Sequence, residues 1–249
     1  MELKKVVAKR SNKTIYKSGD NCVKVFSEEF KHSDVLNEAL NHARAVETGL
    51  LVPQIKDVGV IEGEKWGIVT EYVEGKTLSA LFKENPDKID EYLENFVDLQ
   101  LEIHSKKSPL LNKLKDKMTR KIDETTFDAT TRYELKMRLD SMPKHDKVCH
   151  GDFTPSNIIV NDKGWYVIDW SHATQGNASA DVARTYLIFN LNYNEEIANK
   201  YLDIFCKKSD TAKQYVLKWL PIVAASQSVK GNKEERDFLA KWVDVVEYE

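Results

Sequence analysis

The sequence predicts an α+β fold of two lobes, a small antiparallel sheet carrying one helix and a larger, mainly helical lobe. Two observations predict it. The first quarter of the chain holds short apolar or β-branched segments separated by polar turns, with one helical stretch among them. After residue 75 helical periodicity dominates and is interrupted by one β-rich segment at 148–169. Strands that give way to helices are typical of an antiparallel sheet rather than an alternating parallel one.

Five strands and one helix are expected in the first quarter. The helix should run from Asp34 to Thr48, with Ser33 as its N-cap and Gly49 as its stop, because apolar residues recur there at helical spacing. Residues 62–64 should form a hairpin turn. The strands are expected at 6–8, 14–16, 22–26, 55–61 and 66–72. The boundary between the lobes should follow near residues 73–76, which gives lobes at 1–73 and 74–249.

The composition is that of a globular protein and excludes several function classes. Charged residues make up 31% of the 249 residues and the net charge is −3, so no positive field attracts nucleic acid. We interpret the basic run at 113–121 as a solvated helix face. The three cysteines are widely spaced without a CxxC pattern, which suits a reducing compartment. No apolar run is long enough to span a membrane. We therefore expect a cytoplasmic monomer or homodimer without nucleic-acid or membrane partners.

The residues that carry chemistry lie between 149 and 170. Asp152 lies in a turn region, and Asn157 precedes an apolar strand. A turn then returns the chain into a second apolar strand that ends at Asp169. A hairpin of this kind brings Asn157 and Asp169 to the same end, so the three side chains can converge.

These three side chains offer oxygen ligands without nitrogen or sulfur, which suits Mg²⁺ better than zinc. Phosphoryl transfer needs such parts, a carboxylate that deprotonates the hydroxyl and oxygen ligands that hold the metal against the phosphates. The alternative is that they are ordinary turn and strand-end residues. A zinc or hydrolase site made of Cys149, His150, Asp152 and His172 is disfavoured. Adjacent strand residues such as Cys149 and His150 point to opposite sides, and no HExxH, CxxC or GxSxG motif is present.

The segment His150-Gly-Asp152, with Asn157 five residues after Asp152, and the segment Ile168-Asp169-Trp170 resemble the signature of the aminoglycoside phosphotransferase and choline kinase family, relatives of eukaryotic protein kinases. The resemblance covers essentially the whole chain. It implies a protein-kinase-like fold, with a nucleotide-binding lobe at 1–73 and a helical lobe at 74–249 that holds the catalytic loop and the acceptor site. It also implies that Asp152 is the catalytic base, that Asn157 and Asp169 bind magnesium, and that His150 supports the loop.

Lys24 lies inside an apolar strand, where a lysine is costly unless its ammonium group finds an anion. The resemblance implies that this anion is the α/β-phosphate of ATP, with Glu38 on the following helix as its ion-pair partner. The alternative is that Lys24 occupies the polar face of an alternating strand. The resemblance further implies that Asp181 caps a helix and braces the catalytic loop.

By the same resemblance, the adenine ring would meet the Thr70 carbonyl and the Tyr72 amide, with Val69 behind it. The loop at 10–14, which would cover the nucleotide, departs from the family because it contains no glycine. Ser11 and Asn12 can still donate hydrogen bonds to phosphates.

The predicted function is transfer of the γ-phosphate of ATP or GTP to a hydroxyl of a small molecule, such as an aminoglycoside, an amino sugar or a choline-like alcohol. A protein kinase is disfavoured by Gly151, where protein kinases usually carry arginine, and by the short connection at 170–181. An inactive nucleotide-binding regulator is the other alternative. A cationic acceptor would favour nearby carboxylates, although these are often merely solvated. The candidates are Glu195, Glu196, Asp244, Glu247 and Glu249.

Overall fold

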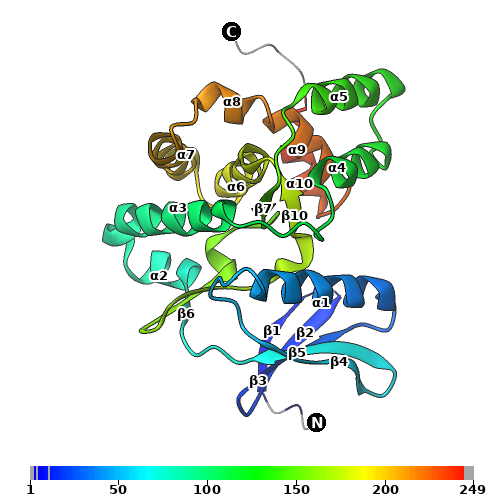
Figure 1. The fold of residues 1–249 in the computed structure, drawn as a ribbon, viewed down its shortest axis with the longest axis vertical. Coiled ribbons are helices and arrows are strands. Elements are labelled where there is room, and N and C mark those ends of the chain that lie inside the picture. The colour runs from blue at the N-terminus through cyan, green and yellow to red at the C-terminus, as the bar shows by residue number, and fades with distance from the viewer. Residues whose placement is uncertain (1–2, 4, 11, 244–249) are drawn as a thin grey trace. The chain divides into compact units, whose positions relative to one another are not determined.

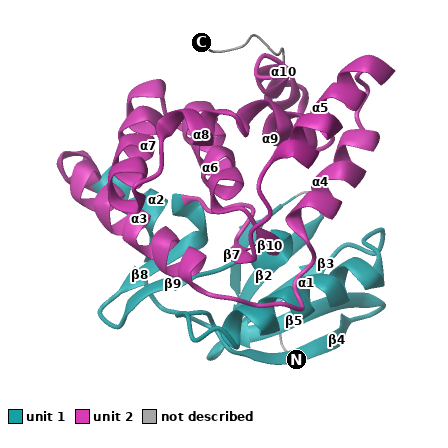
Figure 2. Cartoon of the chain, turned by 45° about the horizontal axis from the view of Figure 1, so that its top comes forward, with its two compact units in different colours: residues 1–84, 155–173 teal, residues 85–154, 174–249 magenta. Residues whose placement is uncertain are grey.

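A computed structural model describes residues 3, 5–10 and 12–243, and the chain forms two compact units (Figure 2). Unit 1 comprises residues up to Glu84 together with 155–173, and unit 2 comprises 85–154 and the residues from Thr174 onward. Within the described residues, no helix combines the length and the apolar character that crossing a membrane requires.

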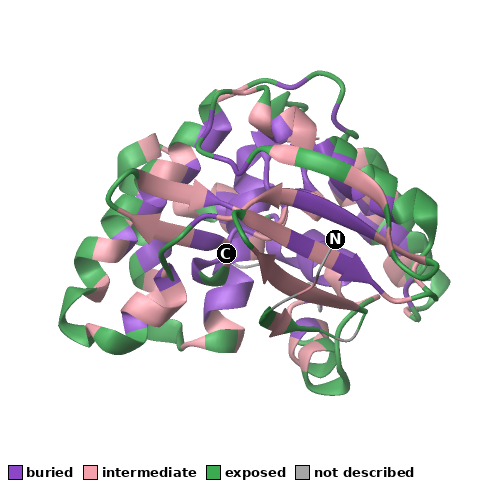
Figure 3. Ribbon diagram, turned by 90° about the horizontal axis from the view of Figure 1, so that it is seen from below, coloured by how far each residue is buried: buried purple, intermediate pink, exposed green. Residues whose placement is uncertain are grey.

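Unit 1 is built on a five-stranded antiparallel sheet with the strand order β1-β2-β3-β5-β4 (Figure 1). This arrangement confirms the predicted antiparallel sheet, and each strand includes most of the segment expected from the sequence. Burial does not alternate strictly along the strands, since Gly67, Ile68 and Val69 of β5 are buried in succession. Figure 3 shows buried and half-buried segments along the sheet. The strands are β1 (Lys5–Lys9), β2 (Lys13–Ser18), β3 (Asn21–Phe26), β4 (Ile55–Glu62) and β5 (Lys65–Glu71).

Helix α1 (His32–Val46) covers one face of this sheet, where its Val35 and Ala39 pack against Phe26 and Ile68. The helix begins before the predicted N-cap: Lys31 occupies the cap position without a side-chain hydrogen bond, and Ser33 lies in the first turn. The prediction of Ser33 as the cap is therefore wrong.

The end of α1 and the turn after β4 agree with the sequence prediction. Gly49 has φ +78° and its N–H donates to the Val46 carbonyl, which ends the helix as predicted. Gly63, with φ +56°, lies in the turn between β4 and β5, as expected for the hairpin at 62–64.

A second sheet in unit 1 explains why residues 155–173 belong to it. The strand order is β6-β8-β9, so β6 pairs antiparallel with a strand about eighty positions later in the chain. The Val167 N–H also donates to the Leu51 carbonyl at 2.9 Å. These packing units differ from the predicted division at 1–73 and 74–249, whose functional assignment stays a prediction. The elements are β6 (Lys76–Thr77), α2 (Leu78–Glu84), η2 (Pro155–Asn157), β8 (Ile158–Asn161), β9 (Gly164–Val167) and η3 (Trp170–His172).

Unit 2 is mainly helical, as predicted. Helices α6 and α9 are its most buried elements, and an aromatic cluster of Phe96, Phe153, Phe189 and Tyr201 packs beside α6. The two-stranded ladder of β7 and β10 carries the segment that leads to Asp152. The elements are η1 (Pro86–Lys88), α3 (Ile89–Ser105), α4 (Leu114–Asp123), α5 (Ala129–Ser141), β7 (Lys147–Cys149), β10 (Thr174–Gly176), α6 (Ala178–Asn192), α7 (Glu195–Ser209), α8 (Lys213–Leu217), α9 (Leu220–Gln227) and α10 (Lys233–Ala240).

Candidate functional site

Lys24 lies in the middle of β3 on the sheet face that α1 covers. Its neighbours Val23 and Val25 point to the other face, because successive strand residues alternate. The Lys24 ammonium group donates to the carboxylate of Glu38, a buried residue of α1. The predicted ion pair is therefore confirmed, and it offsets the free-energy cost of enclosing a lysine in an apolar strand.

Asp169 joins this pair from the end of the β8–β9 hairpin. Its Oδ1 lies 3.3 Å from Lys24 Nζ, and its Oδ2 lies 3.3 Å from Lys13 Nζ. Lys13 Nζ is also 3.8 Å from Glu38 Oε1. Two ammonium groups and two carboxylates thus form a compact set of charges, the four-charge cluster of Lys13, Lys24, Glu38 and Asp169.

The backbone around Asp169 is held in a conformation that few non-glycine residues adopt. Its φ of +61° and ψ of +60° lie in the left-handed region, which costs of order 1–3 kcal/mol unless the surroundings impose it. Helix α1 contributes to these surroundings, since Asn41 Nδ2 donates to the Ser171 carbonyl at 3.4 Å. The strained backbone directs the Asp169 carboxylate toward the two lysines.

The cluster holds its groups in their charged forms. Burial alone would raise the pKa of Asp169, but the Lys24 and Lys13 ammonium groups outweigh it and hold that pKa well below the usual range. Burial likewise acts to lower the pKa of Lys24, yet Asp169 and Glu38 raise it above its ordinary value. Asp169 is therefore an ionised oxygen ligand at neutral pH.

Asn157 lies at the same end of the hairpin as Asp169. Its carbonyl accepts a 2.9 Å hydrogen bond from the Ile168 N–H, and the next pair in the ladder is Ile158 with Val167. The prediction that these two residues lie at the same end of the hairpin is confirmed, and their binding of magnesium stays a prediction. Within the described residues, no group of three or more His, Cys, Asp and Glu side chains could hold a metal ion. An amide oxygen and an ionised carboxylate still fit magnesium, which is usually bound through few protein ligands together with phosphates and water.

In unit 2, Asp181 fixes the loop that precedes Asp152. This buried carboxylate accepts from the backbone N–H groups of His150 at 3.1 Å and Gly151 at 2.7 Å, and it lies 3.1 Å from His104 Nε2. Burial would raise the pKa of Asp181, but its hydrogen bonds with His104 and with the Gly151 N–H lower it instead. Gly151 has φ +79°, a conformation that other residues rarely adopt.

The structure contradicts one part of the prediction for Asp181. The N-cap of α6 is Asn177, whose side chain accepts from the Ser179 N–H at 3.0 Å, while Asp181 lies in the first turn. The Asp181 carboxylate cannot cap α6, because it is engaged by the loop amides. Its contact with the loop is present as predicted, and its effect on activity stays a prediction.

Asp152 has a backbone held by a hydrogen bond and a partly exposed side-chain carboxylate. Its N–H donates to Nδ1 of the fully buried His150 at 3.2 Å, and its side chain is 33% exposed. Arg184 Nη2 lies 3.4 Å from Oδ1 of Asp152 and 3.9 Å from Glu235. Sequence reasoning missed the contacts of Arg184. Asp152 belongs to unit 2, whereas Asn157 and Asp169 belong to unit 1, so the convergence of the three stays a prediction.

The predicted adenine contacts need correction. The Tyr72 N–H donates to the Asp20 carbonyl at 2.9 Å, and Thr70 pairs with Cys22 in the ladder, so the sheet already uses the Tyr72 amide. Val69 packs with Val23 on the sheet face opposite Lys24. Because a one-residue shift along a strand exchanges its two faces, the role that the resemblance implied for Val69 falls on the side away from Lys24.

The remaining predicted contacts are less defined. Ser11 lies outside the described residues, as do Asp244, Glu247 and Glu249. Asn12 borders an open cavity of about 470 Å³ that is lined by residues of β1, β2, β3 and β5, and its carbonyl accepts from the Ser27 N–H at 2.9 Å. Glu196 lies on α7, 3.5 Å from Lys200.

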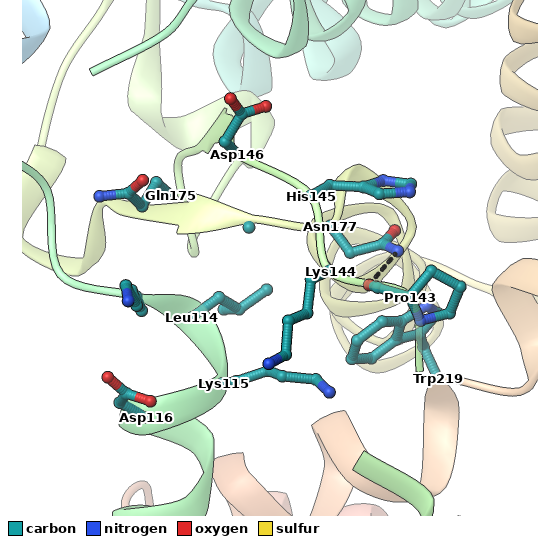
Figure 4. Close-up of a pocket in the computed structure, with 12 residues that line it drawn as sticks. Leu114, Lys115, Asp116, Pro143, Lys144, His145, Asp146, Gln175, Asn177 and Trp219 are labelled. Carbon is teal, nitrogen blue, oxygen red and sulfur yellow. Dashed lines mark hydrogen bonds between the residues drawn. The ribbon is translucent and has the colours of Figure 1, made fainter. Parts of the chain in front are cut away.

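A second cavity, of about 560 Å³, lies in unit 2 between α4, β10 and the segment at 143–146 that precedes β7 (Figure 4). Asn177 and Trp219 line it, and Asn177 Nδ2 donates to the Pro143 carbonyl at 3.2 Å. None of the predicted site residues lines this cavity.

Comparison with known proteins shows the family and the fold of the chain. A family model described as the phosphotransferase enzyme family matches residues 2–217. The chain belongs to this family. The family description indicates a phosphotransferase.

Over 67 residues the chain is 36% identical to the protein LicA homolog of Mycoplasma capricolum, and this match spans 27% of each protein. The fold is similar to that of choline kinase LicA from Streptococcus pneumoniae, with a TM-score of 0.65 and 16% identity over 98% of this chain and 92% of that one. It is also similar to a thermostable mutant of aminoglycoside phosphotransferase APH(4)-Ia in complex with ADP and hygromycin B. There the TM-score is 0.71 and the identity 14%, over 98% and 92% of the chains. The predicted protein-kinase-like fold is confirmed.

The basic run at 113–121 is only partly the solvated face that its composition predicted, because Lys113 and Arg120 are exposed whereas Lys121 is buried. Lys121 lies on the buried side of α4 with Leu114 and Met118, and its Nζ is 3.4 Å from Gln227 Oε1. Burial, together with neighbouring cations, lowers the pKa of Lys121 to about 8 and that of Lys117 to about 7.

Replacing Lys121 with methionine should stabilise the protein. Because the folded-state pKa lies below the ordinary value of 10.5, the contribution of Lys121 is most unfavourable below pH 8 and is relieved as the pH rises toward 10.5. Lys121→Met should raise the free energy of unfolding at pH 7 by on the order of 1–3 kcal/mol. The rise of this free energy between pH 7 and 9 should be smaller in the variant than in the wild type. Chemical denaturation at both pH values measures this, with the exposed Lys113→Met as control. A less stable variant with an unchanged pH slope would contradict it.

Proposed function

We propose that the protein transfers the γ-phosphate of ATP to a hydroxyl group of a small molecule, with magnesium held by Asn157 and Asp169. The observation that carries this proposal is the four-charge cluster in unit 1. It places a strand lysine, paired with a helix glutamate, against the strand-end aspartate that lies beside Asn157. Kinases use a lysine, a glutamate and a metal-binding aspartate in the same relation to one another.

Each residue of the site has a distinct task in this reaction. Lys24, held in place by Glu38, would bind the α- and β-phosphates. Asn157 and Asp169 would hold the magnesium ion, which neutralises phosphate charge when bound. Asp152 would orient the acceptor hydroxyl and take its proton, since its carboxylate is partly exposed while its backbone is fixed.

The linker after β5 would bind the adenine edge through its backbone. Because the Tyr72 amide is engaged by Asp20, the next amide along the chain is that of Val73, where the ladder between β3 and β5 has ended. We assign the donor to Val73 in place of Tyr72. On the sheet face that carries Lys24, the cross-strand pair Cys22 and Thr70 takes the place predicted for Val69.

The acceptor belongs to the class of small hydroxylated molecules, for which aminoglycosides, amino sugars and choline-like alcohols are the first candidates. The choline kinase and the hygromycin B complex among the similar structures favour these compounds. An inactive regulator is disfavoured because Lys24, Asp152, Asn157 and Asp169 are all present. ADP release measured with a panel of such alcohols tests the proposal. Tight ATP binding without turnover of any acceptor would favour the regulator.

Replacing Asp152 with asparagine should lower kcat on the acceptor found in that panel by about 10²- to 10⁴-fold, because the base acts in the transition state. The affinity for ATP should stay unchanged. Steady-state kinetics and calorimetric titration with ATP measure the two quantities. Asp146→Asn, at an exposed carboxylate of the same unit, is the matched control. Near-full turnover of the Asp152 variant would remove Asp152 from the role of base.

Replacing Asp169 with asparagine should abolish the part of the ATP affinity that depends on magnesium, because the ionised ligand is lost. Binding of metal-free ATP should be retained, since Lys13 and Lys24 then face one carboxylate fewer. Calorimetric titrations with and without magnesium measure this difference. Asp162→Asn, in the exposed turn of the same hairpin, should behave like the wild type. A magnesium effect of normal size in the Asp169 variant would place the metal elsewhere.

A further inference from the structure

A second lysine is as deeply enclosed in the four-charge cluster as Lys24. Lys13 is the first residue of β2 and lies within the glycine-free segment at 10–14. The exposed fraction of its side chain is 15%, against 17% for Lys24. Its ammonium group lies within ion-pair distance of both carboxylates in the cluster, at 3.3 Å from Asp169 and 3.8 Å from Glu38. Lys13 is therefore part of the interior of the site.

The register of the sheet accounts for this position. Ile15 of β2 lies directly opposite Lys24 of β3, so the two side chains share one face. Lys13, two residues before Ile15, points to the same face and is a diagonal neighbour of Lys24, within reach of long side chains. The contact between Lys13 and Asp169 thus follows from strand pairing.

The charges of the cluster balance only while no metal is bound. A magnesium ion on Asp169 would add two positive charges beside two ammonium groups that share two carboxylates. The oxygens of Asp169 that accept from lysine are also those that a metal would use. A polyphosphate that binds together with the metal would neutralise this excess of positive charge. When the metal replaces the Lys13 ammonium group beside Asp169, the polyphosphate would also give Lys13 a new anion to bind.

The loop before Lys13 strengthens this argument. It has no glycine, so the close backbone approach by which such loops bind phosphates is restricted. A lysine at the end of the loop can supply by charge what the backbone amides do not. We propose that Lys13 is a second phosphate-binding lysine, which leaves Asp169 when the magnesium–nucleotide complex binds and then contacts the β- and γ-phosphates. This inference rests on the proposed function.

Calorimetric titration of Lys13→Met with ATP, ADP and AMP, each with magnesium, tests the inference. The dissociation constant for ATP should rise about tenfold or more, because a charged hydrogen bond is lost. The effect on ADP should be smaller, and AMP affinity should not change. Lys13→Arg keeps the charge and should retain most of the ATP affinity. Lys5→Met, at an exposed lysine of β1, should bind all three nucleotides like the wild type.

Thermal unfolding of each variant controls for folding, and Lys13→Gln replaces the methionine variant if that one does not fold. Unchanged ATP affinity would overturn the inference. A gain in ATP affinity would also overturn it, because this is expected if Lys13 only neutralises Asp169 in the free protein. An equal loss of affinity for ATP and AMP would overturn it as well, because it indicates a structural role for Lys13. If the wild-type protein fails to bind ATP with magnesium, the proposed function is overturned instead. The wild-type titration therefore distinguishes failure of the proposed function from failure of the inference about Lys13.

Discussion

The carboxylate of Asp169 is the group on which the arrangement of unit 1 depends. A half-buried carboxylate is costly unless cations and hydrogen bonds surround it, and here lysines from two strands meet that requirement. Satisfying it draws together elements that are distant in the sequence: β2 and β3 bring the lysines, α1 brings Glu38, and the β8–β9 hairpin brings the aspartate. The sheet register, the position of α1 and the strained turn at Asp169 are all consistent with this single charge balance.

Two carboxylates of unit 2, those of Asp181 and Asp152, lie in different environments, which supports the tasks proposed for them. Asp181 is fully enclosed and its oxygens are occupied by loop amides and His104, so it can only hold structure. Asp152 is partly exposed, and the side-chain contacts to its carboxylate include one with Arg184, a longer contact at 3.4 Å. The enclosed aspartate fixes the loop whose next residue is Asp152. A general base requires a rigid backbone and an accessible carboxylate. Asp181 supplies the rigidity of the loop, and the carboxylate of Asp152 is accessible.

Much of the fold and part of the site follow from the sequence. Apolar and β-branched segments between polar turns located the strands of unit 1. A lysine enclosed in an apolar strand indicated an anionic partner, and the family resemblance assigned Glu38 to pair with it. The turn at 161–164 predicted that Asn157 and Asp169 share one end of a hairpin. The errors arise where a pattern leaves one parameter open. The resemblance does not say which face of β5 carries Val69, and the structure places Val69 on the face opposite Lys24. Helical periodicity does not reveal how deeply Lys121 is enclosed by α9, and only the pairing of β2 with β3 shows that Lys13 reaches Asp169.

A crystal structure with manganese and a non-hydrolysable ATP analogue would examine this charge balance most directly. Manganese takes the place of magnesium and is located by its anomalous scattering. We expect one ion within about 2.3 Å of oxygen atoms of both Asn157 and Asp169, with Lys24 on the α- and β-phosphates. An ion bound away from both residues, or a nucleotide whose phosphates do not approach Lys24, would contradict the assignment of the cluster as the nucleotide site.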